Sequence, residues 1–262
     1  MGYRLSCLLL LWSVGFSTSV LATEEVRIAV ASNFLIPLKS LAKTFTSQTG
    51  IPVYVSNGAS GMLYAKIKRG APYDLFFSAD ARRPLLLEQE GLIEKGSRFT
   101  YVVGRLVAWS PDEKKISANL LKLNTADPEF RYLAMANPKT APYGVASVAV
   151  LKYYGLYESL TAQKKIALGE SVGKAYQYTM TGNAQIGLVA KSYVLNSMHS
   201  VKGEVFDIPR NVYPILKQEA VILKGRKTAA VVKFLTFFQT PVVQQQIQAF
   251  GYDIPFSQEG EE

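Results

Sequence analysis

The segment VRIAVASNFLIPLKSLAKTFTSQTGIPVYVSNGASGML, from Val26 to Leu63, contains the pattern that decides the fold. Its first apolar run, Val26–Ala31, is typical of a buried strand, and the apolar residues that follow recur at helical spacing. Gly50 suits the end of that helix, and Ile51–Ser56 is typical of a second strand. Ser56, Asn57 and Gly58 are expected as turn residues before the next helix. The segment therefore predicts alternating strands and helices.

The same alternation continues along the chain. Tyr73–Asp80 predicts a third strand, with helices before and after it, and Glu219–Gly225 predicts a late strand. Two closing helices are divided at Thr240-Pro241, where proline can open the second. Strand and helix in alternation favour a mixed, mainly parallel sheet flanked by helices, so the fold class is α/β.

Residues 1–22, MGYRLSCLLLLWSVGFSTSVLA, have the pattern of a secretory signal. A single basic residue, Arg4, precedes an apolar run and a small-residue site that ends at Ala22. The apolar run is shorter than the roughly 20 residues that a membrane-spanning helix needs. The only cysteine, Cys7, lies within that run and not at the cleavage point, which argues against a lipid anchor. We therefore expect an exported, soluble protein of residues 23–262.

The charge balance is basic, with 29 Lys and Arg against 20 Asp and Glu, a net charge of +9. Without Arg4 it is 28 − 20, or +8. Such a surface could attract nucleic acid, an acidic membrane or small anions. The basic residues are scattered, without the clusters that follow a nucleic-acid backbone. We expect no nucleic-acid partner and a mild attraction of anions toward a cleft.

Four loops place small or polar residues before predicted helices: Ser32-Asn33, Ala59-Ser60-Gly61, Pro142-Tyr143-Gly144 and Ser171-Val172-Gly173. In open parallel sheets, ligands bind beyond the carboxyl ends of strands, where such loops lie. A helix start has unpaired N–H groups and a partial positive charge, so several converging starts would bind an anion without Lys or Arg.

A purely structural interpretation exists for each of these residues. Ser32, Ser60 and Ser171 are good N-cap residues, and capping alone accounts for most serines before helices. Tyr143 could be a packed aromatic and Asn33 a turn residue. No single loop is a specific signal.

Enzymatic interpretations lack the necessary residues. The only histidine, His199, lies in the polar stretch NSMHSVKGE, and no cysteine follows Cys7. A metal cluster or a Ser-His triad therefore has few available parts. Asp74 and Asp80 near the third strand can serve as helix caps as readily as bases. A lysine-activated serine hydrolase stays open, although nothing indicates one. We expect no enzymatic activity and no cofactor.

Three segments resemble the periplasmic molybdate-binding proteins of ABC importers. They are AVASNFLIPLKSLAKTF, NGASGMLYAKIKRGAPYDLFFSAD and APYGVASVAVLKYYGL, and they occur in the same order over nearly the whole mature chain. The resemblance implies a two-lobed periplasmic binding protein of the second type, with an oxyanion in the cleft between lobes. One lobe would contain 23–104 and 219–262, and the other 105–218. It also implies a monomer that partners a membrane ABC permease.

The resemblance also implies the ligand donors. The serines of the first two loops match Ser32 and Ser60, and Asn33 matches a polar donor used in part of the family. The backbone N–H groups of the second lobe match Tyr143 and Val172. These residues would hold molybdate as an oxyanion and not as a bare metal ion. Some members use a tyrosine hydroxyl after the strand IGLV, where this chain has Ala190, so Asn33 or the Tyr143 side chain would supply the missing donor.

The donor set favours a fully deprotonated dianion. Molybdate, tungstate and sulfate need only donors, whereas phosphate keeps a proton and needs an acceptor, and the matched positions contain no Asp or Glu. Size would separate molybdate from sulfate, because each buried donor left unmet costs roughly 1–3 kcal/mol. Molybdate and tungstate are of nearly equal size. The alternatives are the same fold with sulfate, an organic anion or ferric iron as ligand.

Overall fold

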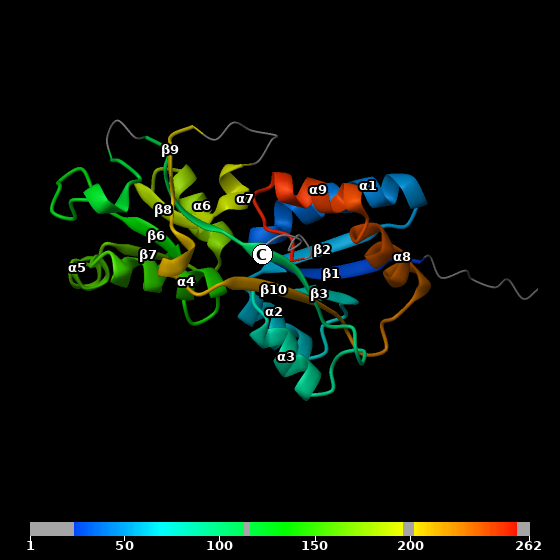
Figure 1. Cartoon of the computed structure of the whole chain (residues 1–262). Coiled ribbons are helices and arrows are strands. Elements are labelled where there is room, and N and C mark those ends of the chain that lie inside the picture. The colour runs from blue at the N-terminus through cyan, green and yellow to red at the C-terminus, as the bar shows by residue number, and fades with distance from the viewer. Residues whose placement is uncertain (1–23, 113–115, 196–201, 256–262) are drawn as a thin grey trace, which may run out of the picture.

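The computed structural model describes residues 24–112, 116–195 and 202–255, where the chain forms two five-stranded sheets flanked by helices (Figure 1). The predicted signal segment and His199 lie outside these residues. In spatial order, the first sheet contains β2 (Val53–Gly58), β1 (Val26–Ala31), β3 (Leu75–Phe77), β10 (Leu216–Ile222) and β4 (Phe99–Gly104). The second contains β7 (Ile166–Gly169), β6 (Leu133–Ala136), β8 (Ile186–Ala190), β5 (Leu106–Ser110) and β9 (Glu204–Asp207).

Each sheet has one strand that runs against the other four. In the first sheet β1 pairs in parallel with β2 and β3, whereas β10 is antiparallel to β3 and β4. In the second sheet β6 pairs in parallel with β7 and β8, whereas β5 is antiparallel to β8 and β9. The predicted α/β class with mixed, mainly parallel sheets is confirmed.

The helices cover both faces of each sheet (Figure 1). In the first sheet Ile28 and Val30 of β1 pack with one group of helices, and Ala29 between them packs with the other, as the alternation of a strand requires. The first group is α1 (Leu35–Thr49), α8 (Ala229–Phe238) and α9 (Pro241–Ala249), and the second is α2 (Ser60–Lys68) and α3 (Arg82–Gln89).

The second sheet is covered in the same way. Leu133 and Met135 of β6 face one group of helices, and Ala134 packs with Ala175 on the opposite face. These helices are α4 (Pro142–Tyr153) and α5 (Tyr157–Ala162) on one face, with α6 (Val172–Met180) and α7 (Lys191–Val194) on the other. Short 3-10 helices are η1 (Ser32–Phe34), η2 (Leu120–Lys122) and η3 (Arg210–Val212).

The chain passes between the sheets twice. A single residue, Arg105, separates β4 from β5, and the return lies between the end of β9 at Asp207 and the start of β10 at Leu216. The late strand predicted to begin at Glu219 therefore begins three residues earlier, because Leu216 to Gln218 pair with β4.

The end of β2 also differs from the expectation. Asn57 and Gly58 belong to the strand and not to a turn, since they pair in register with Val30 and Ala31 of β1. Hydrogen bonds to a neighbouring strand outweigh the local turn preference of Asn and Gly. The strand therefore ends at Gly58, and a single residue, Ala59, separates it from the start of α2.

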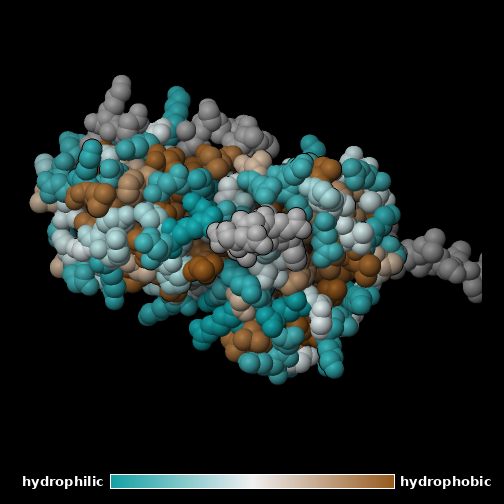
Figure 2. All heavy atoms as spheres, in the orientation of Figure 1, coloured by the Kyte–Doolittle hydropathy of each residue, from teal (hydrophilic) through white to brown (hydrophobic). Residues whose placement is uncertain are grey.

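The surface shows hydrophobic residues dispersed among hydrophilic ones on the face drawn in Figure 2. Scattered exposed apolar side chains are normal for a folded chain and do not by themselves mark an interface. Among the described residues, no helix is both long and apolar enough to cross a membrane.

Gly144 provides a test of the packing around α4. A Cβ atom there would lie 2.5 Å from the carbonyl oxygen of Ala136 and 2.7 Å from the nitrogen of Pro138, both backbone atoms. We expect Gly144→Ala to lower the free energy of unfolding by about 1–3 kcal/mol, measured by urea denaturation. Val145→Ala, which changes an exposed neighbour in the same turn, is the control and should cost less than about 0.5 kcal/mol. Equal stability of the two variants would contradict the packing described.

Candidate anion-binding site

All five predicted site residues lie just beyond the carboxyl ends of strands. Ser32 and Asn33 open η1 directly after β1, and Ser60 opens α2 after β2. Tyr143 and Val172 lie in the first turns of α4 and α6, which follow β6 and β7. Because β1 and β2 are parallel neighbours, as are β6 and β7, each pair of loops lies at one edge of its sheet. Each of the five residues is at most 3% exposed.

Hydrogen bonds between neighbouring residues join the four loops into one site. Gly61 N donates to the carbonyl oxygen of Thr140 at 3.0 Å, which connects the start of α2 with the loop before α4. The hydroxyl of Thr140 donates to the carbonyl oxygen of Glu170 at 3.2 Å, and Gly173 N donates to Ser32 Oγ at 3.3 Å. The structure therefore brings the four predicted loops together between the two sheets.

The helix starts at this place have free donors. Within the described residues, the backbone N–H groups of Ser60, Tyr143 and Val172 donate to no protein acceptor. Unpaired N–H groups in a first helical turn are expected, but a buried one needs a partner from outside the helix. Three of them, from both sheets, form a donor set for an anion.

The hydrogen bonds of the serine hydroxyls distinguish a helix cap from candidate ligand donors. Ser171 is a cap, because its Oγ accepts from Lys174 N at 3.3 Å. Ser60 is not a cap, because its Oγ accepts from the backbone N–H of Ala79 at 2.9 Å and not from its own helix. Ser32 Oγ accepts from the backbone N–H of Gly173, which lies in a loop of the second sheet. Among the described residues neither hydroxyl has an acceptor for its own hydrogen, so both can donate to a ligand.

The side chains of Asn33 and Tyr143 take part in a buried polar cluster around Gln218. Asn33 Nδ2 donates to Gln218 Oε1 at 2.7 Å and to the hydroxyl of Tyr252 at 3.1 Å, and Gln218 Nε2 donates to the hydroxyl of Tyr143 at 3.3 Å. Asn33 Oδ1 is buried and has no partner among the described residues. A buried acceptor without a donor costs about 1–3 kcal/mol.

Tyr193 is a neighbour of the site that sequence reasoning missed. Its hydroxyl donates to the carbonyl oxygen of Ser32 at 2.6 Å, and a Cβ atom on Gly173 would lie 2.6 Å from that hydroxyl. It lies in α7, which directly follows Ala190, the position where some relatives were expected to have tyrosine. Nothing in the local pattern KSYV distinguishes Tyr193 from an ordinary packed aromatic.

The positive field at the site comes from backbone groups. Among the described residues, no Asp or Glu side chain is hydrogen-bonded to any of the five predicted site residues, and no group of three potential metal ligands is present. Arg83 lies beside Gly61, where a Cβ atom would be 2.9 Å from its Nη2, but it forms an ion pair with Asp80. Its charge is thus largely compensated, and the helix starts remain the main source of positive potential.

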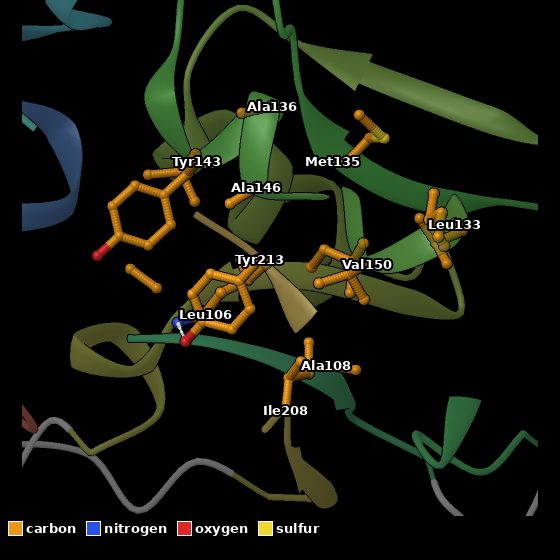
Figure 3. Packing of buried hydrophobic residues seen from close by; sticks show 14 of the residues in the cluster. Leu106, Ala108, Leu133, Met135, Ala136, Tyr143, Ala146, Val150, Ile208 and Tyr213 are labelled. Carbon is orange, nitrogen blue, oxygen red and sulfur yellow. Dashed lines mark hydrogen bonds between the residues drawn. The ribbon is translucent and has the colours of Figure 1, made fainter. Parts of the chain in front are cut away.

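Four tyrosine hydroxyls around the site stay neutral at physiological pH. Burial raises the pKa of Tyr101, Tyr143, Tyr193 and Tyr252 well above the ordinary tyrosine value, because the phenolate would lose its solvation. They therefore act as hydrogen-bonding groups without charge. Figure 3 shows Tyr143 at the edge of the apolar cluster that also contains Tyr213, whose hydroxyl accepts from Leu106 N at 3.2 Å.

Two sheets with donor-rich loops between them define a protein that binds a small solute, and comparison with known proteins agrees. The chain belongs to the family of bacterial extracellular solute-binding proteins, whose model matches residues 26–253. This is a family of binding proteins, not of enzymes.

The relatives identify the branch of the family. The molybdate-binding protein ModA of Azotobacter vinelandii is 38% identical over 257 residues, which cover 97% of this chain and 100% of that protein. ModA of Rhodobacter capsulatus is 40% identical over 232 residues, 88% of this chain and 89% of that protein. The solved structure of the Azotobacter vinelandii periplasmic molybdate-binding protein has a TM-score of 0.82, with 88% of this chain and 99% of that chain covered at 38% identity. The chain is a homologue of these proteins, which confirms the predicted resemblance.

The buried tyrosines predict how stability depends on pH. Their folded-state pKa values lie above the unfolded value of about 10, so their contribution is complete below that pH and is lost as the pH rises above it. We expect the free energy of unfolding to fall above about pH 10, measured by urea denaturation at several pH values. Tyr252→Phe should reduce this loss, whereas Tyr54→Phe, at an exposed position, should not. A flat alkaline profile would contradict the burial described.

Proposed function

We propose that this chain captures molybdate, and also tungstate, in the periplasm and delivers it to the permease of an ABC importer. The observation that carries the proposal is the donor set, namely the N–H groups at three helix starts and two serine hydroxyls. Within the part of the chain that the structure describes, these N–H groups have no acceptor and no carboxylate is hydrogen-bonded to the site residues. The homologues named as molybdate-binding proteins support the same ligand.

The proposed ligand contacts follow from the donors available. Ser32 and Ser60 would donate through their hydroxyls, and Ser60, Tyr143 and Val172 through backbone N–H groups. A dianion that carries no proton can accept from all of them, whereas monohydrogen phosphate also needs an acceptor for its proton. Sulfate has the right protonation state but is smaller, so it would leave some buried donors unmet.

We propose that the two sheets are the centres of two lobes that close over the anion. The lobes expected from the sequence, 23–104 with 219–262 and 105–218, change at one bound: residues 216–218 join the first lobe, because they pair with β4. Hydrogen bonds from Gly61 to Thr140 and from Gly173 to Ser32 join residues of the two proposed lobes and would form part of the closed arrangement. Binding would shift an equilibrium toward this arrangement, because only there do donors from both lobes reach one ligand.

The proposed partner is the membrane permease, and the proposed state of the free protein is a monomer. The closed arrangement would present the two lobes together, and the permease would distinguish it from the open one. Nucleic acid is not a proposed partner, since the net charge of +9 comes from dispersed residues and the family exports its members.

A ligand panel tests the proposed specificity. A ligand that binds only the folded state raises the melting temperature according to its concentration and affinity. We expect clear increases with molybdate and tungstate, a smaller one with sulfate, and none with phosphate or Fe(III), all measured by thermal denaturation of residues 23–262. An increase with sulfate and none with molybdate or tungstate would overturn the proposal.

Ser60→Ala tests the proposed role of the second loop. The loss of one hydrogen bond to a charged ligand, about 1.5–3 kcal/mol, should weaken molybdate binding by on the order of tenfold or more. Trp109 is the only tryptophan outside the predicted signal segment, and it stacks on Tyr176 (5.2 Å between ring centroids), which stacks on Tyr193 (4.6 Å) beside the site. Its fluorescence should therefore report the titration. Ser40→Ala, at an exposed position on α1, is the control, and equal affinity of both variants would mean that Ser60 does not contact the ligand.

A further inference from the structure

Gln218 is a fully buried glutamine that connects the two halves of the site. It lies in β10, at 0% exposure, and contacts Asn33 after β1 and Tyr143 in α4. A Cβ atom on Gly104 would lie 2.3 Å from Gln218 Nε2 and 2.4 Å from the hydroxyl of Tyr143. The side-chain amide is thus held tightly at the point where the chain crosses between the sheets.

Three hydrogen-bonding groups around this amide are poorly satisfied in the present arrangement. Asn33 Oδ1 has no donor among the described residues. The single hydroxyl hydrogen of Tyr101 has two acceptors, Gln218 Oε1 at 2.9 Å and the carbonyl oxygen of Ser78 at 3.1 Å. The hydroxyl of Tyr143 accepts from Gln218 but, within the described residues, donates to nothing.

One concerted change satisfies all three groups. If both amides turn by half a rotation, Gln218 Nε2 donates to Asn33 Oδ1 and to the hydroxyl of Tyr101, which then donates to Ser78 alone. Gln218 Oε1 accepts from Tyr143. No proton is transferred, because only two amides and the hydroxyl hydrogens of Tyr101, Tyr143 and Ser192 reorient. The shape of the cluster is unchanged, since the two ends of an amide have nearly the same size.

The turned pair introduces one new donor. Asn33 Nδ2 takes the position that Oδ1 now occupies, where Oδ1 has no donor among the described residues. The oxyanion proposed as ligand can supply the acceptor there. The hydroxyl of Ser192, which donates to the carbonyl oxygen of Asn33 at 2.8 Å, lies 3.1 Å from that of Tyr252 and can turn to donate to it. The hydroxyl of Tyr252 then keeps its own bond to the carbonyl oxygen of Asn33 at 2.7 Å.

We propose that Gln218 is a positioning residue that sets the orientation of the Asn33 amide, and that anion binding selects the turned pair. Without the anion Asn33 presents its carbonyl oxygen, and with it the amide presents N–H. The inference rests on the proposed function, because the acceptor that meets Nδ2 is the oxyanion. Gln218 thereby links the ligand to Tyr143 and to the crossing at Gly104 without touching the ligand.

A double-mutant cycle tests this link. Molybdate affinity is measured by Trp109 fluorescence in the wild-type protein, Asn33→Ala, Gln218→Met and the double variant. We expect each single variant to bind about tenfold more weakly and the double variant to be little weaker than either, because both changes remove one shared donor. Effects that simply multiply, or wild-type affinity in Gln218→Met, would overturn the proposal. Gln163→Met, which removes an exposed glutamine amide that donates to Ser159 Oγ, is the matched control.

A second measurement needs only the wild-type protein. The side-chain NH₂ signals of Asn33 and Gln218, assigned by NMR through their own backbones, should both shift as molybdate is added, with the same saturation. Unchanged Gln218 signals in a protein that binds molybdate would overturn the proposal even if Gln218→Met failed to fold. Failure of the wild-type protein to bind molybdate would instead overturn the proposed function, so the two failures are distinguishable.

Discussion

Backbone N–H groups buried at helix starts need acceptors, and this requirement organises the centre of the molecule. At α2, α4 and α6 the first-turn donors have no partner in the described protein and lie where the loops from the two sheets meet. Water would satisfy such groups on a surface, but the residues here are at most 3% exposed. An anion satisfies several of them at once and interacts favourably with the helix dipoles. The buried helix starts are therefore stable side by side only when such a ligand, or water retained in the site, accepts hydrogen bonds from their N–H groups.

The crossing between the sheets controls whether this convergence is possible. Only Arg105 separates β4 from β5, and its carbonyl oxygen accepts from Lys191 N at 2.9 Å, at the start of α7. The neighbouring residues of α7 donate to the carbonyl oxygens of Ser32 and Asn33 through the hydroxyls of Tyr193 and Ser192. The crossing, α7 and η1 therefore form one connected unit. A change in the angle between the sheets would break these bonds together with the contacts at the loops.

Sequence reasoning reached the fold and the loops but not the cluster behind them. The alternation of β1 and α1 and the small residues before α2, α4 and α6 are local patterns, so both could be predicted. Gln218, Tyr193 and Tyr252 act through contacts with residues 60 to 219 positions away, and no local pattern indicates such a pairing. Local preference also failed at Asn57 and Gly58, where pairing with β1 extended the strand. The serines could not be divided into caps and site residues until Ser60 Oγ was seen to accept from Ala79 and Ser171 Oγ from Lys174.

The proposed use of main-chain donors at Tyr143 and Val172 has a consequence for evolution. Substituting either residue changes a side chain but leaves its N–H in place, so most point mutations at these positions cannot delete the proposed contact with an anion. Selectivity can then drift only through the few positions that shape the backbone, such as Gly144 and Gly173, whose added Cβ atoms would meet other atoms at 2.5 and 2.6 Å. A lineage can therefore exchange much of its sequence around the cleft while its ligand stays the same.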